Sequence, residues 1–299
     1  MTTIWVMVLL SAVGAGPVSL PELVRPVPKG TLIIDGGGQP SPLVKQRALM
    51  LAGGLKAIVV ILPQASNLPT SGPKAEKRWR DAGAENVSIL ALTDPKLAVA
   101  AILHADLIWI SGGDQDRLMQ RLEGTGVADA IRLRYQEGGI IGGSSAGAAV
   151  MSDIMISRSV DEYPKPLCDY PLMGRGLGLL PGVIVDQHFL KLHRADRLKR
   201  AMSEFPGLIG IGIDESTAAF VSEGQKIEVV GNSLITIFDP RLKPRPKMSV
   251  LKVSNSTKPK AVDLEIAHEP GPITISTLNP GVTFHLERGI ISDPIAETR

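Results

Sequence analysis

The chain has 299 residues, 44% of them hydrophobic and 21% charged, a composition typical of an ordered globular protein. The formal net charge is only +2 and no long block of Lys or Arg occurs, so neither nucleic acid nor an anionic membrane is expected as a partner. The single cysteine, Cys168, excludes an internal disulfide. Its loop-like surroundings, "KPLCDYP", indicate a small filler side chain.

An apolar run from Ile4 to Gly16 precedes a Pro-rich stretch near the N-terminus. The run is too short to span a bilayer as a helix. Its small-residue end resembles the cleavage region of a secretory signal, although no Lys or Arg precedes it. We therefore expect residues 1–28 to be a signal segment with a Pro-rich spacer, and the protein to be exported to the periplasm or the exterior without a membrane span. If the run is instead an extra strand or helix of the domain, a cytoplasmic location is expected.

Short apolar segments alternate with longer amphipathic ones between residues 31 and 221. The expected strands, each with its following loop, are residues 31–38, 56–66, 105–115, 138–145, 182–189 and 207–216. The expected helices are residues 41–53, 73–85, 116–138 and 190–205. Strands that are apolar throughout and separated by helices indicate a mostly parallel sheet covered on both faces. The sequence thus predicts an α/β fold, an αβα sandwich, for a main domain of residues 29–222.

The pattern changes after residue 222 to an alternation of apolar and polar residues. Turn signals such as Gly231-Asn232 and Asn279-Pro280-Gly281 separate the alternating segments. This pattern predicts a small β-rich C-terminal extension, residues 223–299.

The most reactive side chains follow the predicted strands, and ligands of parallel sheets bind beyond the carboxyl ends of the strands. At one such end, Gly143-Ser144-Ser145-Ala146-Gly147 matches G-x-S-x-G, the pattern of a nucleophile on a strained turn between a strand and a helix. The small neighbours give the turn room, and the amide of Ala146 is placed to help bind an oxyanion. The alternative is an ordinary Gly/Ser turn.

A serine nucleophile needs a base, and His188 is the candidate among the five histidines. It follows the apolar strand "GVIV" and so reaches the edge where Ser145 is expected. An imidazole there can take the serine proton and return it to the leaving amine. The alternative is a strand-end histidine that is bonded to the backbone.

The acid that orients the imidazole is expected from Asp214 or Glu215, at the end of another apolar strand. Successive strand side chains point to opposite faces, so only one of the two is expected to reach the site, and the spacing does not say which. Asp153 and Asp161, after the serine motif, are competitors.

Four segments, in this order and at these separations, resemble cyanophycinase and its relatives in the serine peptidase family that also contains aspartyl dipeptidase. The segments are "SGGDQDRL", "GGSSAGAAVM", "DQHF" and "GIGIDES". The resemblance implies a fold similar to class I glutamine amidotransferases and a Ser-His-Glu triad made of Ser145, His188 and Glu215. The implied activity is that of an exopeptidase or omega peptidase, which hydrolyses aspartyl or β-aspartyl bonds of a peptide or isopeptide substrate through an acyl-enzyme. A homodimer is left open.

The same resemblance assigns substrate contacts and oxyanion donors. It implies that Gln115, Asp186 and Gln187 line the substrate pocket and that Gly112 and Gly113 lend backbone amides to the oxyanion hole. The residue types fit these roles, because a glycine pair lets the main chain approach a ligand and a carboxylate pairs with a substrate amine or guanidinium. The alternatives are a polar helix start for Gln115 and a helix cap for Asp186.

One segment departs from the family's pattern. The family continues "DQHF" as F-x-x-R-x-R-x-x-R-L; here Arg194 and Arg197 keep the second and third basic positions, and Leu192 replaces the first. Arg194 and Arg197 therefore remain candidate substrate contacts. An aliphatic side chain cannot hold a carboxylate in a bidentate grip, so this departure bears on binding of the branched β-aspartyl-arginine polymer more than on hydrolysis.

Other chemistries lack their motifs. No G-x-x-x-x-G-K-[ST] segment occurs, and the dinucleotide fingerprint that Gly36 and Gly38 begin has Ser41 where its third glycine belongs. No Cys/His cluster or H-E-x-x-H segment offers a metal site, so neither a metal nor a cofactor is expected. Two other functions use the same features: a non-catalytic binding protein that keeps the fold, and an esterase with the same serine motif.

Overall fold

The computed structural model describes residues 26–39, 41–159, 170–241 and 273–292. The predicted signal segment as far as residue 25, Asp161, Cys168 and much of the C-terminal extension therefore lie outside the described residues. Within the described ranges, no helix combines the length and the apolar character needed to cross a membrane.

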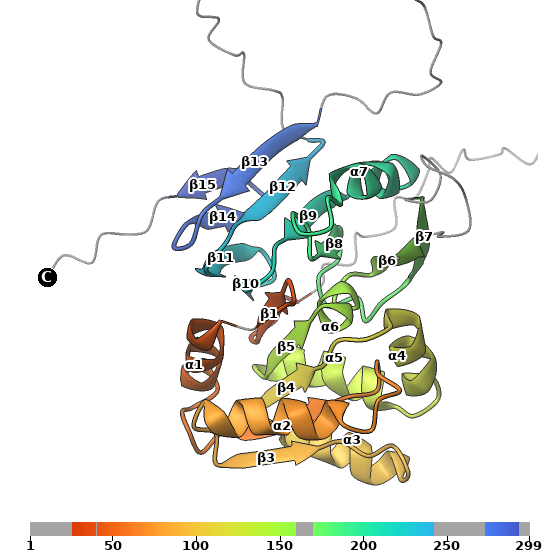
Figure 1. Ribbon diagram of the computed structural model, residues 1–299, viewed down its shortest axis with the longest axis vertical. Helices are drawn as coiled ribbons and strands as arrows, with labels where there is room; N and C mark the ends of the chain where they lie inside the picture. The colour runs from red at the N-terminus through yellow and green to blue at the C-terminus, as the bar shows by residue number, and fades with distance from the viewer. Residues whose placement is uncertain (1–25, 40, 160–169, 242–272, 293–299) are drawn as a thin grey trace, which may run out of the picture.

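A nine-stranded sheet forms the centre of the molecule, in the order β15-β14-β11-β10-β1-β5-β4-β2-β3 (Figure 1). The parallel part consists of β1 (Thr31–Asp35), β5 (Ile140–Ser144), β4 (Leu107–Ile110), β2 (Ile58–Leu62) and β3 (Asn86–Ile89). The antiparallel part consists of β10 (Thr217–Ser222), β11 (Lys226–Gly231), β14 (Thr283–His285) and β15 (Ile290–Ser292). The inner parallel strands are apolar throughout because both of their faces are covered.

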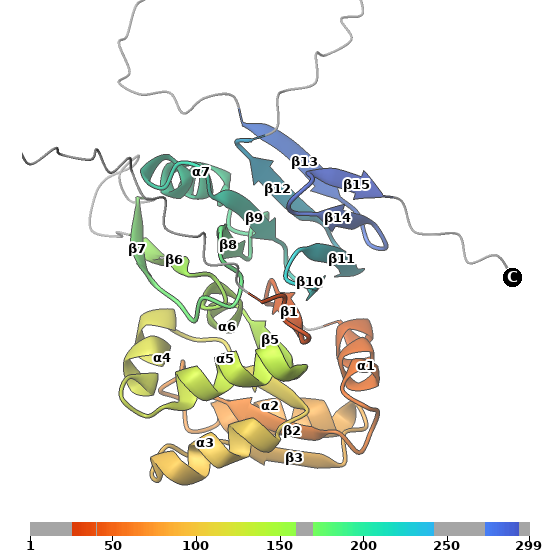
Figure 2. The same ribbon diagram turned by 180° about the vertical axis from the view of Figure 1, so that it is seen from behind.

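Helices cover both faces of the parallel part, as Figures 1 and 2 show from opposite sides. One face carries α1 (Pro42–Leu51) and α2 (Ser71–Asp81), and the other carries α3 (Pro95–His104) and α5 (Val127–Glu137). The predicted amphipathic stretch 116–138 is divided into α4 (Gln115–Leu122) and α5. The division falls at Gly124 and Gly126, which both have positive φ.

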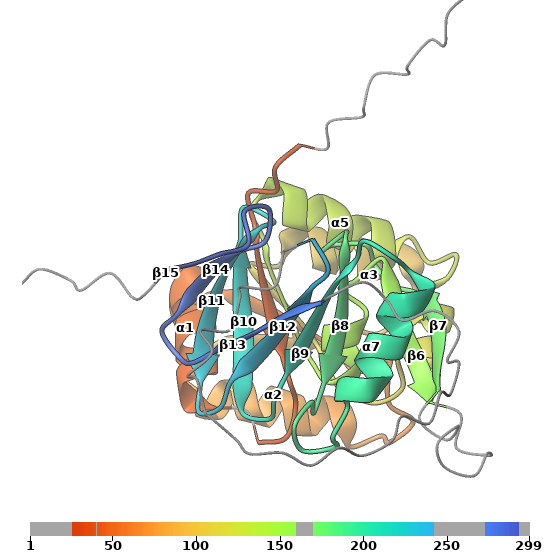
Figure 3. The ribbon, with the colours of Figure 1, turned by 90° about the horizontal axis from the view of Figure 1, so that it is seen from above.

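A second sheet of four strands has the order β13-β12-β9-β8. Its strands are β8 (Val183–Gln187), β9 (Ile209–Ile213), β12 (Ile235–Asp239) and β13 (Thr274–Leu278), of which β8 and β9 are parallel. Helix α7 (Ala195–Glu204) packs on this sheet, as Figure 3 shows. A separate ribbon pairs β6 (Ile154–Ser159) with β7 (Pro171–Arg175). Two of the strands expected from the sequence thus belong to the second sheet rather than to the first.

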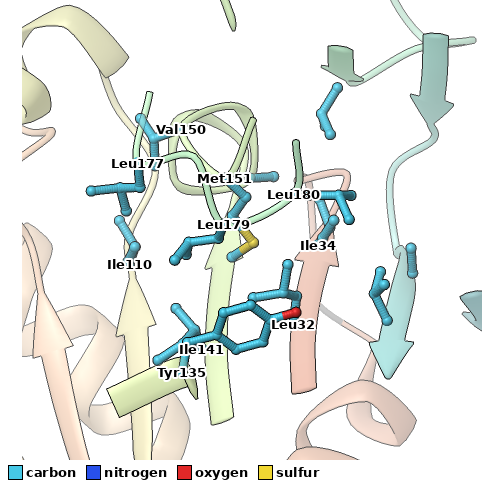
Figure 4. Packing of buried hydrophobic residues seen from close by; sticks show 14 of the residues in the cluster. Leu32, Ile34, Ile110, Tyr135, Ile141, Val150, Met151, Leu177, Leu179 and Leu180 are labelled. Carbon is cyan, nitrogen blue, oxygen red and sulfur yellow. The ribbon is translucent and has the colours of Figure 1, made fainter. Parts of the chain in front are cut away.

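The nine-stranded sheet separates two layers of buried side chains. Side chains alternate along β1, so Leu32 and Ile34 belong to the layer of α3 and α5, while Ile33 belongs to the layer of α1 and α2. Figure 4 shows Leu32 of β1 and Tyr135 of α5 among the side chains of the first layer. Burying a large apolar side chain contributes on the order of 1.5–3 kcal/mol. This packing on both faces fixes the carboxyl ends of β1 and β5, where the site lies.

The described residues after 222 are rich in strands, as predicted, and they are joined to the strands before them. Strand β11 pairs with β10, and β12 pairs with β9, so hydrogen-bonded ladders cross the predicted boundary between residues 222 and 223. The predicted fold class, α/β with a mostly parallel sheet and added C-terminal strands, is confirmed.

Candidate active site

Ser145 lies at the corner between β5 and the short helix α6 (Ala146–Ala149). Its φ of 55° and ψ of −113° are sparsely populated in proteins, and this strained corner is what the serine motif predicts. The motif's glycines provide space, because a Cβ on Gly143 would lie 2.3 Å from the carbonyl oxygen of Gly147. The corner therefore tolerates only the smallest neighbours.

The side chains of His188 and Glu215 meet Ser145 at this corner. His188 follows β8, and its Nε2 lies 2.9 Å from Ser145 Oγ. Its Nδ1 lies 2.8 Å from Glu215 Oε1, and the two side chains are 22% and 33% exposed, respectively. The three groups thus form one hydrogen-bonded relay that is partly sheltered from water and still open to a substrate. Such a relay can move the serine proton to the imidazole while the carboxylate holds the ring in place.

Of the described acids that the sequence left open, Glu215 is the one that contacts His188. The neighbouring Asp214 turns elsewhere and accepts a hydrogen bond of 2.8 Å from the hydroxyl of Ser233. Asp153 pairs with the guanidinium of Arg175 at 3.0 Å. Neighbouring side chains at a strand end point in different directions, which is why one residue of the Asp-Glu pair reaches the imidazole and the other does not.

The last residue of β1 and the loop that follows it, here called the Gly36–Gly38 loop, are hydrogen-bonded to the segments that carry all three side chains. The amide of Ser145 donates to Asp35 O at 3.1 Å, and the amide of His188 donates to Gly36 O at 2.8 Å. The amide of Ser216, next to Glu215, donates to Gly37 O at 3.0 Å. The main chain of this loop therefore links the end of β1 to the two segments that come from the second sheet.

Two glycines of this loop have no room for a side chain. Gly37 has a φ of 96°, and a Cβ on it would lie 2.4 Å from His188 Cε1. Gly38 has a φ of 74°, and its Cβ would lie 2.9 Å from the carboxylate of Glu215. The sequence pattern pointed only to Gly36 and Gly38 as an incomplete dinucleotide fingerprint, so this role of Gly37 and Gly38 was missed. The signal that points to it is their position at the carboxyl end of a parallel strand.

Asp35, the last residue of β1, is a fully buried carboxyl group next to the corner. Its Oδ1 accepts hydrogen bonds of 2.8 Å from the hydroxyl of Ser144 and from the amide of Gly37, while Oδ2 has no partner among the described residues. Burial raises the pKa of Asp35 to about 6, although those two hydrogen bonds and the charge of His188 oppose the rise. The parallel register, which pairs Asp35 with Ser144, brings this carboxyl to the site.

The glycine pair after β4 borders Ser145. A Cβ on Gly112 would lie 3.8 Å from Ser145 Oγ, so the main chain there passes close to the hydroxyl. In the described part of the chain, neither Gly112 nor Gly113 has a hydrogen-bond acceptor for its amide. Ala146 begins α6 and is fully buried behind the corner. The role of these three amides in binding an oxyanion stays a prediction of the sequence.

The side chain of Gln115 has hydrogen bonds within the protein, and Gln187 is buried. Gln115 begins α4, and its amide nitrogen donates to Ile156 O of β6 at 2.8 Å and to Ser157 O. Gln187 ends β8 and is only 6% exposed. In this structure Gln115 ties α4 to the β6–β7 ribbon, and Gln187 is part of the buried end of β8.

Asp186 is fully buried and is surrounded by arginines of the chain itself. Its Oδ2 lies 3.1 Å from Nε of Arg197, and its Oδ1 contacts both Arg197 and, at 3.4 Å, Arg194. The partner predicted for Asp186 was a substrate amine or guanidinium, and the fold supplies two guanidinium groups instead. The same ion pairs occupy Arg194 and Arg197, which the sequence offered as substrate contacts. Leu192 is 53% exposed and takes no part in this cluster.

No group of three or more His, Cys, Asp or Glu side chains in the described ranges is arranged to hold a metal ion.

Solved peptidase structures share this fold. A crystal structure of a peptidase from an acI-B1 Actinobacterium matches with a TM-score of 0.57 at 25% sequence identity, over 71% of this chain and 92% of that chain. The structure of a putative peptidase E protein from Listeria monocytogenes EGD-e is similar in fold, with a TM-score of 0.51 at 17% identity over 68% of this chain and 99% of that one. The fold is thus one that peptidases use.

Similarity in sequence extends this finding. The cyanophycinase of Geminocystis herdmanii (strain PCC 6308) is 38% identical over an alignment 223 residues long, which covers 71% of this chain and 81% of that protein. The cyanophycinase of Synechococcus elongatus is 37% identical over 227 residues, 71% of this chain and 69% of that protein. The model of peptidase family S51 matches residues 32–229. The chain belongs to peptidase family S51, so it is a hydrolase that acts on a peptide substrate, and the resemblance found in the sequence is confirmed.

Proposed function

We propose that this chain is a serine-type peptidase that hydrolyses aspartyl or β-aspartyl peptide bonds, with Ser145 as the nucleophile, His188 as the general base and Glu215 as the orienting acid. The observation that carries the proposal is the continuous relay of hydrogen bonds, 2.9 Å and 2.8 Å long, from the serine hydroxyl through the imidazole to the carboxylate. The strained backbone of Ser145 supports it. The similarity to cyanophycinases supports an aspartyl-type bond as the target.

In the first half of the reaction, Ser145 Oγ attacks the scissile carbonyl carbon while His188 Nε2 takes the hydroxyl proton. The carboxylate of Glu215 accepts a hydrogen bond from Nδ1–H and stabilises the imidazolium. The C–N bond then breaks, His188 gives its proton to the leaving amine, and the acyl group stays on Ser145 as an ester.

In the second half, a water molecule attacks the ester carbonyl and gives its proton to His188. The imidazolium returns a proton to Ser145 Oγ as the acid product leaves. In both halves the negative oxygen of the tetrahedral intermediate is bound by the amides of Gly112, Gly113 and Ala146. One donor of this type contributes about 3 kcal/mol to the transition state.

The test is hydrolysis of α-aspartyl and β-aspartyl dipeptides and of the β-aspartyl-arginine polymer by the purified protein. We expect Ser145→Ala to lower kcat/KM by at least about 10³-fold, because the nucleophile and its base act as a unit. The matched control is Ser203→Ala, which removes an exposed hydroxyl on α7 and should leave the rate unchanged. Turnover that survives in Ser145→Ala contradicts the assignment.

Two further measurements separate the other functions. A fluorophosphonate that labels activated serines should add its mass to the peptide that contains Ser145, and not to the Ser145→Ala protein. Hydrolysis of simple esters without any peptide hydrolysis would favour an esterase, and peptide binding without turnover a binding protein. We expect short peptides to be better substrates than the polymer, because the exposed Leu192 replaces a basic residue of the family's pattern.

A further inference from the structure

A cavity of about 380 Å³ opens beside Ser145. Its wall includes the glycine pair Gly112 and Gly113, together with parts of α1 and α2, the two helices on one face of the parallel sheet in Figure 1. Trp79 of α2 and Trp109 of β4 also line it and pack edge to face, with ring centroids 5.1 Å apart. Among the described residues that line the cavity there is no Asp or Glu.

Helix α2 keeps its own acids away from this cavity. Arg80 pairs with Glu76 at 2.9 Å, and Lys77 pairs with Asp81 at 2.8 Å. None of these four residues lines the cavity. Every acid of α2 is therefore already matched to a base one turn away.

The bases that remain on α2 are Lys74 and Arg78, and both line the cavity. They are four residues apart, so they are neighbours on the helix surface, where like charges destabilise a helix. Lys45 of α1 joins them as a third cation in the wall. None of the three has an ion pair with another residue in the described ranges. Three cations that have no ion pair among the described residues create a positive potential around the cavity, and this potential attracts an anion.

Lys45 is the most sheltered of the three. Burial, and next the charge of Arg78, lower the pKa of Lys45, while the charges of Asp81 and Asp35 oppose this. An ammonium in this position gains most from an anion that enters the cavity and replaces the water it has lost. On the α7 side of Ser145 the gain from an added anion is smaller, because Arg194 and Arg197 already share the buried carboxylate of Asp186.

We propose that Lys45, Lys74 and Arg78 form a carboxylate subsite, in which the substrate places a free carboxylate close to the scissile bond. The proposal rests on the proposed function, since it takes Ser145 as the nucleophile. The glycine pair that would bind the oxyanion is part of the same cavity wall, so a substrate whose carbonyl oxygen points to those amides has its adjacent groups in this cavity.

The subsite accounts for both bond types with one chemistry. A dipeptide with an α-aspartyl bond keeps a free β-carboxylate, and one with a β-aspartyl bond keeps a free α-carboxylate. In both, two carbon atoms separate the scissile carbonyl from the free carboxylate. The shared recognition element is therefore a succinyl half-amide, and the two dipeptides distinguish which source the enzyme accepts.

The first test measures binding alone, with succinate as the probe and Ser145→Ala as the protein. We expect succinate to bind in calorimetric titrations and to change the fluorescence of Trp79 and Trp109, whereas neutral succinamide does neither. The double variant Lys45→Met with Arg78→Met should raise the Kd for succinate at least tenfold. The control Lys96→Met removes an exposed ammonium on α3, on the opposite face of the sheet, and should leave the Kd unchanged. An unaltered Kd in the double variant, or no succinate binding at all, overturns the subsite.

The second test measures selectivity in the protein that retains Ser145. We expect an aspartyl dipeptide to be preferred over its asparaginyl analogue, and Arg78→Met to reduce this preference at least tenfold, mainly through KM. Arg78→Lys should restore part of the preference because it keeps the charge. A preference that is unchanged in Arg78→Met counts against the subsite. Arg78 is exposed, so this variant should keep its fold, which thermal melting checks.

The two proposals fail in different ways. If turnover survives in Ser145→Ala, the proposed function is wrong, and the succinate titration, which needs no turnover, still decides on the subsite. If turnover requires Ser145 but the Kd for succinate does not change when the cations are replaced, the proposed function is supported and the proposed subsite is wrong.

Discussion

Two groups of basic side chains lie near Ser145, and they differ in whether a carboxylate of the protein pairs with them. On the α7 side, Arg194 and Arg197 surround the fully buried carboxylate of Asp186. On the α2 side, Lys45, Lys74 and Arg78 line a cavity whose described lining residues include no acid. Basic residues thus stabilise the end of β8 on the α7 side, whereas on the α2 side they are available to bind an anionic ligand.

The difference shows why a basic residue near a nucleophile is not by itself a substrate contact. The motif after His188 predicts Arg194 and Arg197, at the start of α7, as substrate contacts. In the structure their guanidinium groups bind the main chain of Gln187 and the carboxylate of Asp186. The bases of α2 belong to no recognised motif, and they line the cavity. What separates the two groups is the position of the nearest carboxylate, which depends on the fold.

The largest expected effect comes from breaking the α7 side. Asp186→Asn leaves two guanidinium groups without their buried counter-charge, so we expect the free energy of unfolding to fall by about 3–5 kcal/mol. Urea unfolding followed by circular dichroism measures this. The control Asp196→Asn removes an exposed partner of Lys199 on the same helix and should cost less than about 1 kcal/mol. Wild-type stability in Asp186→Asn would show that the buried cluster does not hold β8.

The next effect concerns Asp35, whose carboxyl group lies within the electrostatic influence of both His188 and Lys45. Burial raises the pKa of Asp35 from 3.8 to about 6, so between these values the folded protein keeps a proton that the unfolded chain has lost. The contribution of Asp35 to the free energy of unfolding therefore falls as pH rises from about 4 to about 6, and it stays constant above about pH 6. The full cost at neutral pH is about 3 kcal/mol. Asp35→Asn should remove this dependence.

Urea unfolding of the wild type and Asp35→Asn at a series of pH values measures that effect as a difference between the two proteins. The difference should shift in favour of the variant across this interval, because the wild type loses stability as Asp35 ionises and Asn does not titrate. Asn also keeps an oxygen that can accept the hydrogen bonds of Ser144 and Gly37. A difference that stays constant with pH would mean that Asp35 is ionised throughout.

The sequence predicts the segments of the site better than it predicts how they meet. The strands that end just before Ser145, His188 and Glu215 are runs in which nearly every residue is buried, so each can be recognised from its own residues. The polar residues that follow them are then placed at strand ends. By contrast, β3 (Asn86–Ile89) was missed, because only one of its four residues is buried.

What local pattern cannot give is pairing between distant strands. That β8 and β9 form a separate sheet depends on their partners, not on their own residues. The role of Asp35 depends on the register that sets it against Ser144, more than a hundred residues later. The cavity cations Lys45 and Arg78 are brought together by the packing of two helices on one face. Each of these facts is non-local, which is why the sequence does not reveal it.

A smaller effect is expected when one arginine on each side, Arg194 or Arg78, is replaced by methionine. Arg194→Met should lower stability by about 1–2 kcal/mol, because its guanidinium is part of the buried cluster, with 18% of the side chain exposed. Arg78→Met should change stability by less than about 0.5 kcal/mol, because Arg78 is exposed and has no ion pair among the described residues. Urea unfolding measures both, and succinate binding should respond in the opposite order. If Arg194→Met abolishes succinate binding while Arg78→Met leaves it intact, the roles of the two sides are reversed.

The smallest effect tests the charge pattern of α2 itself. Lys77→Met removes the pair with Asp81 and should destabilise the protein by about 0.3–0.5 kcal/mol. Lys74→Met should have the opposite sign, because it relieves the repulsion from Arg78 and removes a positive charge from the first turn of the helix, where the helix dipole disfavours it. Thermal melting in low salt resolves the signs, and added salt should shrink both changes. If Lys74→Met destabilises as Lys77→Met does, then Lys74 is neutralised within the protein, and the cavity has one cation fewer for a carboxylate.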